Sequence, residues 1–141
     1  MVAMPFDLDR FLAAQQGIYD GALEELRRGR KTGHWIWFVF PQIAGLGRSE
    51  MSRYYAIASL DEAHVYLAHP VLGARLRECA SALLATEGRT ATEILGSIDA
   101  MKVRSSMTLF ERADPHEPVF GQVLERFYFG VRDEATIALL G

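Results

Sequence analysis

Apolar side chains recur at helical spacing along most of the chain. The first such stretch covers residues 6–28, and its apolar positions are three and four residues apart, which places them on one face of a helix. Gly17 and Gly21 predict a bend or break within it, and Gly29 predicts its C-terminal cap. Gln15 lies on the same apolar face. Its amide either binds a buried backbone group or lines a site.

Capping residues and helix breakers divide much of the remaining chain into short helices. Ser49 or Ser52 can cap a helix through Ile57, and Ser59 opens a capping box for a helix that runs to about His69. Pro70 starts the most regular amphipathic stretch, which Gly88 ends. Four further helices are predicted from Thr90 or Thr92 to Leu95, over residues 100–113 with Asp99 as N-cap, over residues 119–128, and over residues 133–140 with Asp133 as N-cap.

Residues 33–42 depart from this pattern. They contain both tryptophans and two of the eight phenylalanines, and they are followed by a glycine-containing loop of the kind that often carries sites. A small β element is expected at residues 36–40, and in an extended segment Trp35 and Trp37 would point to the same side. This segment forms either the centre of the core or the wall of a pocket.

The pattern as a whole predicts an all-α (mainly α) fold. We expect a compact bundle of about six to eight short helices around the aromatic loop. With 141 residues and 50% hydrophobic content, the chain fits a single domain over residues 1–141. A domain of this size can bury about two thirds of the surface of the unfolded chain.

Charge and cysteine content exclude several partners. The 15 basic and 18 acidic residues give a net charge of -3, which argues against binding a nucleic acid polymer. The chain does not start with a basic head followed by an apolar run, and no uncharged stretch approaches the length of about 18 residues that spans a membrane. The single cysteine, Cys79, cannot form an internal disulfide and is expected to be a buried bystander. We therefore expect a cytoplasmic protein without a membrane partner.

The sequence lacks the motifs of several common classes of enzyme and metal-binding protein. The chain has no phosphate-binding glycine loop, no His-Glu-x-x-His and no Cys-x-x-Cys. Of the four histidines, only His64 and His69 share an element, and their spacing does not align two ligands on one helical face. No sharp Gly-x-Ser-x-Gly turn exposes Ser105 or another serine. We therefore expect no metal site and no cofactor, and we do not expect a serine hydrolase.

A polar array in the predicted helix after Asp99 is the best candidate for chemistry. Asp99, Lys102 and Ser106 stack along one helical face, and Ser105 lies beside them. Serine and threonine in the middle of a helix need a buried hydrogen-bond network or a ligand to compensate for their low helix propensity. A carboxylate-lysine pair beside aromatic rings suits a nucleotide or a ribosyl group, or acid-base chemistry. Alternatively, Asp99 is only a cap and Lys102 an ordinary helix cation.

The candidate site follows from these observations. The candidate catalytic residues are Asp99 and Lys102. The candidate ligand-binding residues share polar or aromatic side chains in apolar surroundings, and they are Gln15, His34, Trp35, Trp37, Gln42, Ser49, Ser105 and Ser106. In this arrangement the tryptophans stack on the ligand or wall it, and His34 and Gln42 form hydrogen bonds with it.

Several of these segments also resemble a known family. They are residues 31–42, residues 45–49, Tyr54-Tyr55, His69-Pro70 with Leu72, and Asp99-Ala100-Met101-Lys102 with residues 105–110. Together they resemble the bacterial family catalogued as domain of unknown function 1810, often labelled calpastatin. The resemblance covers nearly the whole chain and implies a small, mostly helical single domain, without an established activity or catalytic residues. The label calpastatin implies a protease inhibitor of disordered repeats, and this apolar, aromatic-rich chain does not resemble one in composition.

A more remote resemblance concerns the NADAR family, helical enzymes that act on N-glycosidic linkages of the ADP-ribose type. The order of elements is similar, with an early aromatic loop, a helix carrying Lys102 on a polar face, and a late Phe129-Gly130 followed by Asp133. The glutamate of that family's motif has no secure match in this chain, where Glu62 is the nearest candidate.

The sequence patterns and the family resemblances together suggest one expected function and two alternatives. We expect a polar-aromatic pocket that binds a nucleotide-like or ADP-ribose-like small molecule, with hydrolysis of an N-glycosidic bond as the enzymatic activity to test. The first alternative is a non-enzymatic protein-interaction or homo-oligomerisation module, such as a homodimer formed through the aromatic run and the C-terminal helices. In the second alternative, the same residues only build a polar network within the core.

Overall fold

The computed structural model describes residues 6–141, and this part of the chain is all-α, as predicted. It contains ten helices and no strand longer than a single bridge. The helices are α1 (Asp9–Gln15), α2 (Tyr19–Arg28), α3 (Ile36–Val39), α4 (Glu50–Tyr54), α5 (Leu60–Ala68), α6 (Leu72–Ala85), α7 (Ala91–Leu95), α8 (Ser97–Ala113), α9 (Pro118–Tyr128) and α10 (Glu134–Leu140).

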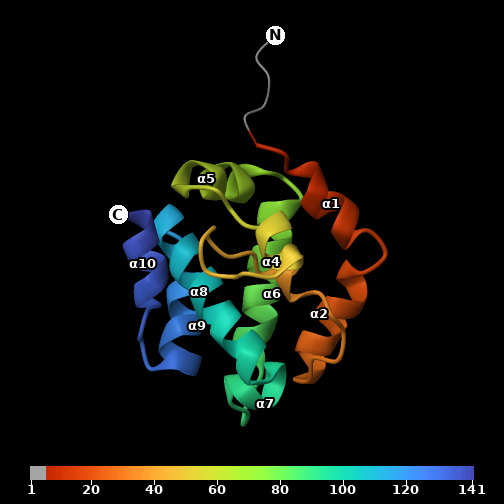
Figure 1. The fold of residues 1–141 in the computed structure, drawn as a ribbon. Coiled ribbons are helices and arrows are strands. Elements are labelled where there is room, and N and C mark those ends of the chain that lie inside the picture. Colours follow the sequence, from red (N-terminus) through yellow and green to blue (C-terminus); the bar gives the residue numbers. More distant parts are fainter. Residues whose placement is uncertain (1–5) are drawn as a thin grey trace.

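The helices pack around α6, which runs through the middle of the bundle (Figure 1). One side is formed by α1 and α2, and the other by α8, α9 and α10. Helix α5 closes one end and packs on α6 and α8, while α7 lies at the other end against α8. The loop before α4 crosses the front of the bundle. The aromatic segment therefore lies between the two sides, within reach of both.

The sequence of α6 explains its central position. Leu72, Leu76, Cys79 and Leu83 recur at spacings of three and four and are all buried on one face. Gly73 permits a close approach to α5, because a Cβ atom at this position would lie 2.1 Å from the Leu67 carbonyl oxygen. Burial raises the pKa of the Cys79 thiol to about 12, so Cys79 is a core residue rather than a nucleophile.

Glycines end helices at two predicted places. The predicted stretch over residues 6–28 is split into α1 and α2, with Gly17 between them at a φ of 75°. Gly29 ends α2 in the left-handed conformation with a φ of 74°, as predicted. This split, together with the short helices α3 and α4, gives ten helices in the described residues where about six to eight were expected.

The expectation of a β element at residues 36–40 was wrong. Residues Ile36–Val39 form the helical turn α3, in which the Phe40 N–H donates to the Ile36 carbonyl (3.0 Å). The amide of Gln15 donates to the Phe38 carbonyl (2.8 Å), so a side chain from α1 supplies a partner that so short a helix cannot provide itself. The β bridge of the described chain instead joins Ile43 and Ile57 and anchors the loop after the aromatic segment.

Most predicted caps are confirmed, but several predicted boundaries were wrong, such as the end of α4, which lies at Tyr54 rather than Ile57. Ser49, Thr90 and Asp133 each accept a hydrogen bond from a first-turn N–H of the helix that follows. Helix α8 starts at Ser97 with Gly96 as its N-cap, so Asp99 belongs to the first turn rather than to the cap. Helix α6 likewise ends at Ala85, before Gly88 is reached.

Across residues 6–141, none of the helices has both the length and the apolar character needed to cross a membrane.

Candidate functional site

Glu25, near the end of α2, organises the turn that leads into the aromatic segment. Its Oε1 accepts hydrogen bonds from the N–H groups of Thr32 (2.7 Å) and Gly33 (2.8 Å) and from Nε1 of Trp35 (3.0 Å). Partial burial raises the pKa of Glu25, but the backbone donors of Gly33 and Thr32 outweigh this effect and leave the pKa below its usual value. The ionised carboxylate thus fixes the path of the chain after α2, a role that the helical pattern of α2 did not indicate.

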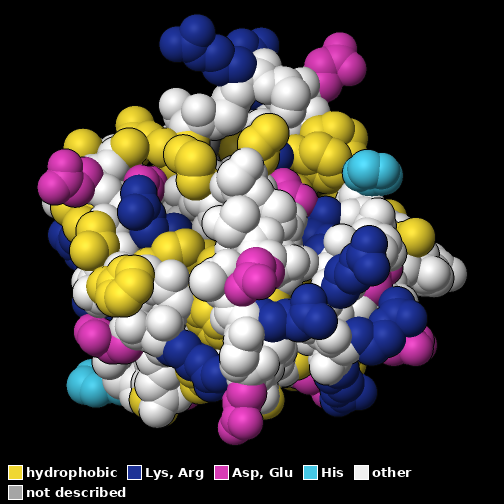
Figure 2. Space-filling model, turned by 90° about the horizontal axis from the view of Figure 1, so that it is seen from below, with side chains coloured by type: hydrophobic (Ala, Val, Ile, Leu, Met, Phe, Trp, Pro, Cys, Tyr) yellow, Lys and Arg dark blue, Asp and Glu magenta, His cyan; other side chains and the backbone are white. Residues whose placement is uncertain are grey.

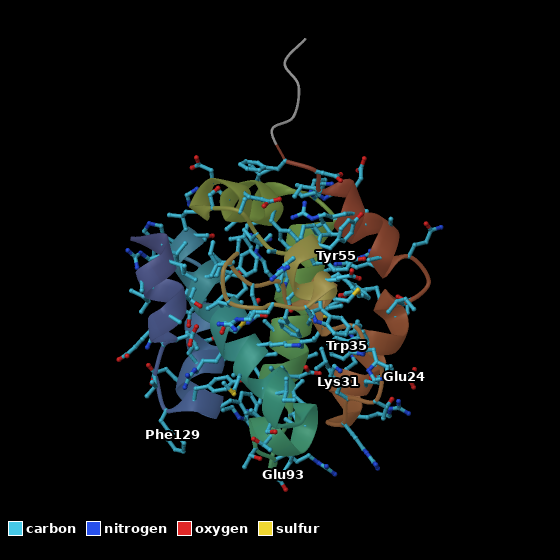
Figure 3. The ribbon with its side chains drawn as sticks, in the orientation of Figure 1. Glu24, Lys31, Trp35, Tyr55, Glu93 and Phe129 are labelled. Carbon is cyan, nitrogen blue, oxygen red and sulfur yellow. The ribbon has the colours of Figure 1, made fainter. Side chains whose placement is uncertain are left out.

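The two tryptophans lie in different surroundings because α3 is helical. Trp35 is only 2% exposed and belongs to the core, next to Lys31 (Figure 3). Trp37 is half-buried, and the Lys102 Nζ lies 5.0 Å from the centre of its ring. The prediction for the two indoles assumed an extended segment, and this segment is instead a helical turn that Trp35 precedes as N-cap. Trp37 is the tryptophan that faces Lys102.

Asp99 and Lys102 of the predicted array lie together, and a second lysine joins them, whereas Ser105 and Ser106 form no hydrogen bond with Asp99. The Asp99 Oδ2 lies 2.7 Å from Nζ of Lys31, and its Oδ1 lies 3.8 Å from Nζ of Lys102. Each ammonium also faces an indole, because the Lys31 Nζ lies 4.9 Å from the centre of the Trp35 ring. Two cations share one carboxylate, so the cluster keeps a net positive charge. The helical pattern did not place Lys31 in the site, because its partner Asp99 is too distant in sequence for a local pattern to reveal.

A cavity of about 450 Å³ opens beside Lys102, and we call it the Lys102 cavity. It lies between the loop after α3, the first half of α8 and the start of α10. Its polar lining comes from Gln42, Lys102, Ser105 and Asp133. The rest of the lining is apolar or glycine, and consists of Leu46, Gly47, Ile98, Met101 and Ala135. Three residues predicted for the site, Gln42, Lys102 and Ser105, therefore meet in one cavity.

Asp133 is the polar lining residue that the sequence did not place in a site. Its Oδ2 accepts hydrogen bonds from the Ser105 hydroxyl (3.1 Å) and from the N–H and hydroxyl of Thr136 (3.1 and 2.6 Å). Its Oδ1 lies 3.6 Å from a guanidinium nitrogen of Arg104. As an N-cap, Asp133 was recognisable from the sequence, but its contacts with α8 arise only when α10 packs there.

The remaining predicted site residues lie outside the Lys102 cavity. Gln15 is buried between α1 and α6, where its Oε1 accepts a hydrogen bond from Arg75 (3.1 Å). His34 is exposed, and Ser49 is the exposed N-cap of α4. Ser106 is fully buried in α8, and its hydroxyl has no hydrogen-bond partner among residues 6–141. Of the predicted site residues, Gln42, Lys102 and Ser105 thus line one cavity, and the others lie elsewhere in the fold.

Within the described chain, no three side chains from His, Cys, Asp and Glu are grouped so that they could hold a metal ion. The Lys102 cavity offers an ammonium, an amide, a hydroxyl and a carboxylate group, and its Lys102 faces a half-buried indole.

Fold and cavity define a small all-α domain with a largely apolar cavity that carries four polar side chains. A family described as protein of unknown function (DUF1810) matches residues 5–140, so the chain belongs to this family. The crystal structure of the conserved hypothetical protein Rv1873 from Mycobacterium tuberculosis is similar, with 50% sequence identity and a TM-score of 0.96 over 97% of this chain and 98% of that one. No curated protein matches the chain. These comparisons do not show the remote resemblance to the NADAR family.

Proposed function

We propose that the protein binds a nucleotide-like small molecule, such as one of the ADP-ribose type, in the Lys102 cavity. The observation that carries this proposal is the position of Lys102, which lines the cavity and faces the ring of Trp37. The ring of Trp37 is not part of the cavity lining, so its role in this proposal is to position the Lys102 ammonium through a cation–π contact.

The size and lining of the cavity suit such a ligand. Its volume of about 450 Å³ falls in the range of pockets that hold small organic molecules. Leu46, Ile98 and Met101 offer apolar contacts to a ring, while Gln42 and Ser105 offer hydrogen bonds to a base edge or to ribose hydroxyls.

The charges near the cavity favour an anion. Lys31 and Lys102 share the single carboxylate of Asp99, and the 3.8 Å separation between Lys102 and Asp99 leaves the Lys102 ammonium free to bind an additional acceptor. Asp133 is the carboxylate that lines the cavity, and its charge is offset by Arg104. A phosphate group would therefore bind at Lys102 with little opposition from nearby acids.

Hydrolysis of an N-glycosidic bond is a further proposed activity at the same place. It requires a carboxylate that activates water. Asp99 does not line the cavity, but it is 19% exposed and lies 3.8 Å from Lys102, so these two residues form the proposed acid-base pair. Asp133 is less suited, because three hydrogen bonds and an ion pair already occupy its oxygens. Incubation with NAD, followed by chromatography for released nicotinamide, tests this activity. Release that Asp99→Asn abolishes would support it, whereas absence of release would leave binding as the function.

Ligand binding can be tested by thermal unfolding and calorimetry with AMP, ADP-ribose and adenosine. A bound ligand raises the melting temperature in proportion to the logarithm of its concentration above Kd. We expect ADP-ribose and AMP to stabilise the wild type, and adenosine to have a smaller effect because it lacks the phosphate. Lys102→Ala should remove the shift, and Lys102→Arg should restore part of it. Arg30→Gln is the matched control, since Arg30 is exposed and does not line the cavity.

Two results of the thermal unfolding experiment would contradict the proposal. If neither AMP nor ADP-ribose shifts the melting temperature at millimolar concentration, or if Lys102→Ala leaves the shift unchanged, the proposal is wrong.

A specific observation also supports self-association as a second candidate function. Ile98 and Met101 lie on successive turns of α8 at the cavity, and their side chains are 70% and 65% exposed. Apolar side chains of this size are often covered in an interface. Sedimentation at micromolar concentration would show a dimer that Ile98→Glu converts to a monomer. A monomeric wild type would exclude this candidate.

A further inference from the structure

A second cavity, of about 420 Å³, lies where the start of α7, the first half of α8 and the end of α9 meet. We call it the arginine cavity, because its charged lining residues are Arg89, Arg104 and Arg126. Met101 lines it as well as the Lys102 cavity, so the two cavities are neighbours on α8. Its volume also falls in the range of small-molecule sites.

The arginine cavity is lined by cations and hydroxyls without a carboxylate. Thr90, Thr92 and Ser97 add hydroxyl groups to the three guanidinium groups. Glu93 accepts the Thr90 N–H (2.8 Å) as part of a capping box, and Asp133, which does not line this cavity, forms an ion pair with Arg104 at 3.6 Å. Three guanidinium groups with this one ion pair leave an excess of positive charge at the cavity, which a bound anion would offset.

Two of the three arginines have donors to spare. Arg126 is structural, because its guanidinium donates to the carbonyls of Leu84 and Thr86 at the end of α6. Nε of Arg104 is buried and lacks an acceptor anywhere in residues 6–141, and its terminal nitrogen lies as far as 3.6 Å from Asp133. Arg89 is exposed and makes neither a hydrogen bond nor an ion pair with the part of the chain that is described. Guanidinium groups with free donors are well suited to phosphate oxygens.

An aromatic residue in an unusual conformation lies at the same cavity. Phe129 has a φ of 55° and a ψ of 30°, in the left-handed region that a bulky side chain rarely adopts. It is 92% exposed and points away from the body of the molecule in Figure 3. The neighbouring Tyr128 is fixed, because its hydroxyl donates to the Ala100 carbonyl (2.5 Å). A strained and exposed phenylalanine gains nothing from packing in this fold, and such strain is often retained at binding sites.

The face of the molecule seen in Figure 2 carries both basic and apolar side chains. Lys and Arg side chains are most numerous on the right of this view, and hydrophobic side chains are exposed mainly on the left and along the upper part. The lining of the arginine cavity likewise combines the guanidinium group of Arg89, which precedes α7, with the exposed ring of Phe129, the C-cap of α9. A ligand that suits it has an anionic end and an apolar end.

We propose that the arginine cavity is a second binding site, which takes an aromatic phosphate monoester. Its phosphate binds to Arg89 and Arg104, and its ring packs against Phe129. This site is separate from the Lys102 cavity, and its existence does not depend on the function proposed there.

Phenyl phosphate is a suitable probe, with inorganic phosphate and phenol as its two halves. The amide and arginine Nε–H signals of the ¹⁵N-labelled protein can be followed by NMR during titration. We expect phenyl phosphate to shift the Arg104 Nε–H and the amides of Ser97 and Phe129. Inorganic phosphate should shift the same arginine signal with at least about a tenfold weaker affinity, because a tenfold change corresponds to the contribution of one good apolar or hydrogen-bonded contact.

Variants distinguish the contributions of charge and ring. Arg89→Gln should weaken binding of phenyl phosphate about tenfold, with little effect on the fold because Arg89 is exposed. Phe129→Ala should weaken phenyl phosphate but leave inorganic phosphate unchanged. Arg28→Gln, at an exposed arginine outside both cavities, is the control. Lys102→Ala separates the two proposals, because it should leave this site intact.

Three results would overturn the proposal. The first is that phenyl phosphate shifts none of these signals at millimolar concentration. The second is that Arg89→Gln weakens binding no more than Arg28→Gln does, which would indicate nonspecific attraction to a basic surface. The third is that the signals that move surround Lys102, and that Lys102→Ala abolishes the movement.

Discussion

Lys31, just after α2, reaches Asp99 in the first turn of α8, and their charged atoms lie 2.7 Å apart. The Lys31 side chain is only 6% exposed, whereas that of Asp99 is 19% exposed. This ion pair connects the two sides of the bundle and holds the carboxylate beside Lys102. Its energetic role therefore differs from that of the weaker contact between Asp99 and Lys102 at 3.8 Å.

We predict that Asp99→Asn destabilises the protein more than Lys102→Met does. Without its carboxylate, the nearly buried Lys31 ammonium loses its charged partner, which should cost about 1–3 kcal/mol. Lys102→Met removes a more exposed and longer ion pair, which should cost less than about 1 kcal/mol. Urea unfolding of both variants and of Lys31→Met measures these values. Equal costs for Asp99→Asn and Lys102→Met would contradict the assigned role of Lys31.

Glu25 should make stability depend on pH in the acid range. Its pKa is lowered in the folded state, so its contribution is fully present above the unfolded-state pKa of about 4.3 and is lost as pH falls through the lower folded-state value. Glu25→Gln should cost about 1–2 kcal/mol at pH 7, because the charge-assisted bonds from Thr32, Gly33 and Trp35 become neutral ones. The difference from wild type should shrink below pH 4. Unfolding curves between pH 3 and pH 7 measure it.

Glu24→Gln is the matched control for Glu25. Glu24 is the neighbouring acid, it is exposed, and it points to solvent in Figure 3. Its substitution should change stability little at any pH. A pH-independent difference between Glu25→Gln and wild type would show that the charge of Glu25 is not what stabilises the turn.

Gly73→Ala should destabilise the packing of α6 on α5. The added methyl group would lie 2.1 Å from the Leu67 carbonyl oxygen, so the backbone must move, at a cost of about 1–3 kcal/mol. Gly21→Ala is an informative comparison, because Gly21 is also helical but has no atom within 4 Å of an added Cβ. It should stabilise α2 by about 0.5–1 kcal/mol. Thermal unfolding should thus shift in opposite directions for the two alanine variants.

Phe129→Gly should raise the melting temperature. Glycine adopts the left-handed conformation of residue 129 without strain, which should stabilise the protein by up to about 1 kcal/mol, and the exposed ring contributes no burial. Phe129→Ala removes the ring but keeps the Cβ atom, so it should leave stability nearly unchanged. If both variants destabilise the protein equally, the ring of Phe129 packs against the fold and the assumption of strain is incorrect.

Capping residues and glycines were sufficient to predict many of the helix ends from the sequence. Gly29 was predicted as a helix end and takes the left-handed conformation, and Thr90 forms a capping box with Glu93. These signals concern residues within one turn of each other, where side-chain type nearly determines the geometry. In contrast, Gly96 starts α8 without a side-chain cap, so the sequence pointed to the later Asp99 instead.

The site was harder to predict because its contacts cross long distances in sequence. The spacing on one helix correctly placed Asp99 next to Lys102. That spacing could not show that Lys31 joins them, or that Asp133 binds Ser105, since these contacts depend on how α2 and α10 pack against α8. The secondary structure of the aromatic segment was also mispredicted because it depends on a contact distant in sequence. A run as short as residues 36–39 suits a strand or a helical turn equally well, and its tertiary partner Gln15 decides between them.

The position of Gln15 determines when α3, whose Trp37 faces Lys102, becomes ordered. Its amide joins α3, 23 residues away, to Arg75 of α6, 60 residues away, so the short helix that carries Trp37 is held by elements remote in sequence. Four residues cannot maintain a helix alone, and α3 should therefore form and dissolve only with the whole domain. Its amides should exchange with solvent at the rate of global unfolding. Lys102, which lines the cavity, then faces an indole that is already fixed before a ligand binds, and the conformational entropy lost on binding is mainly that of the ligand itself.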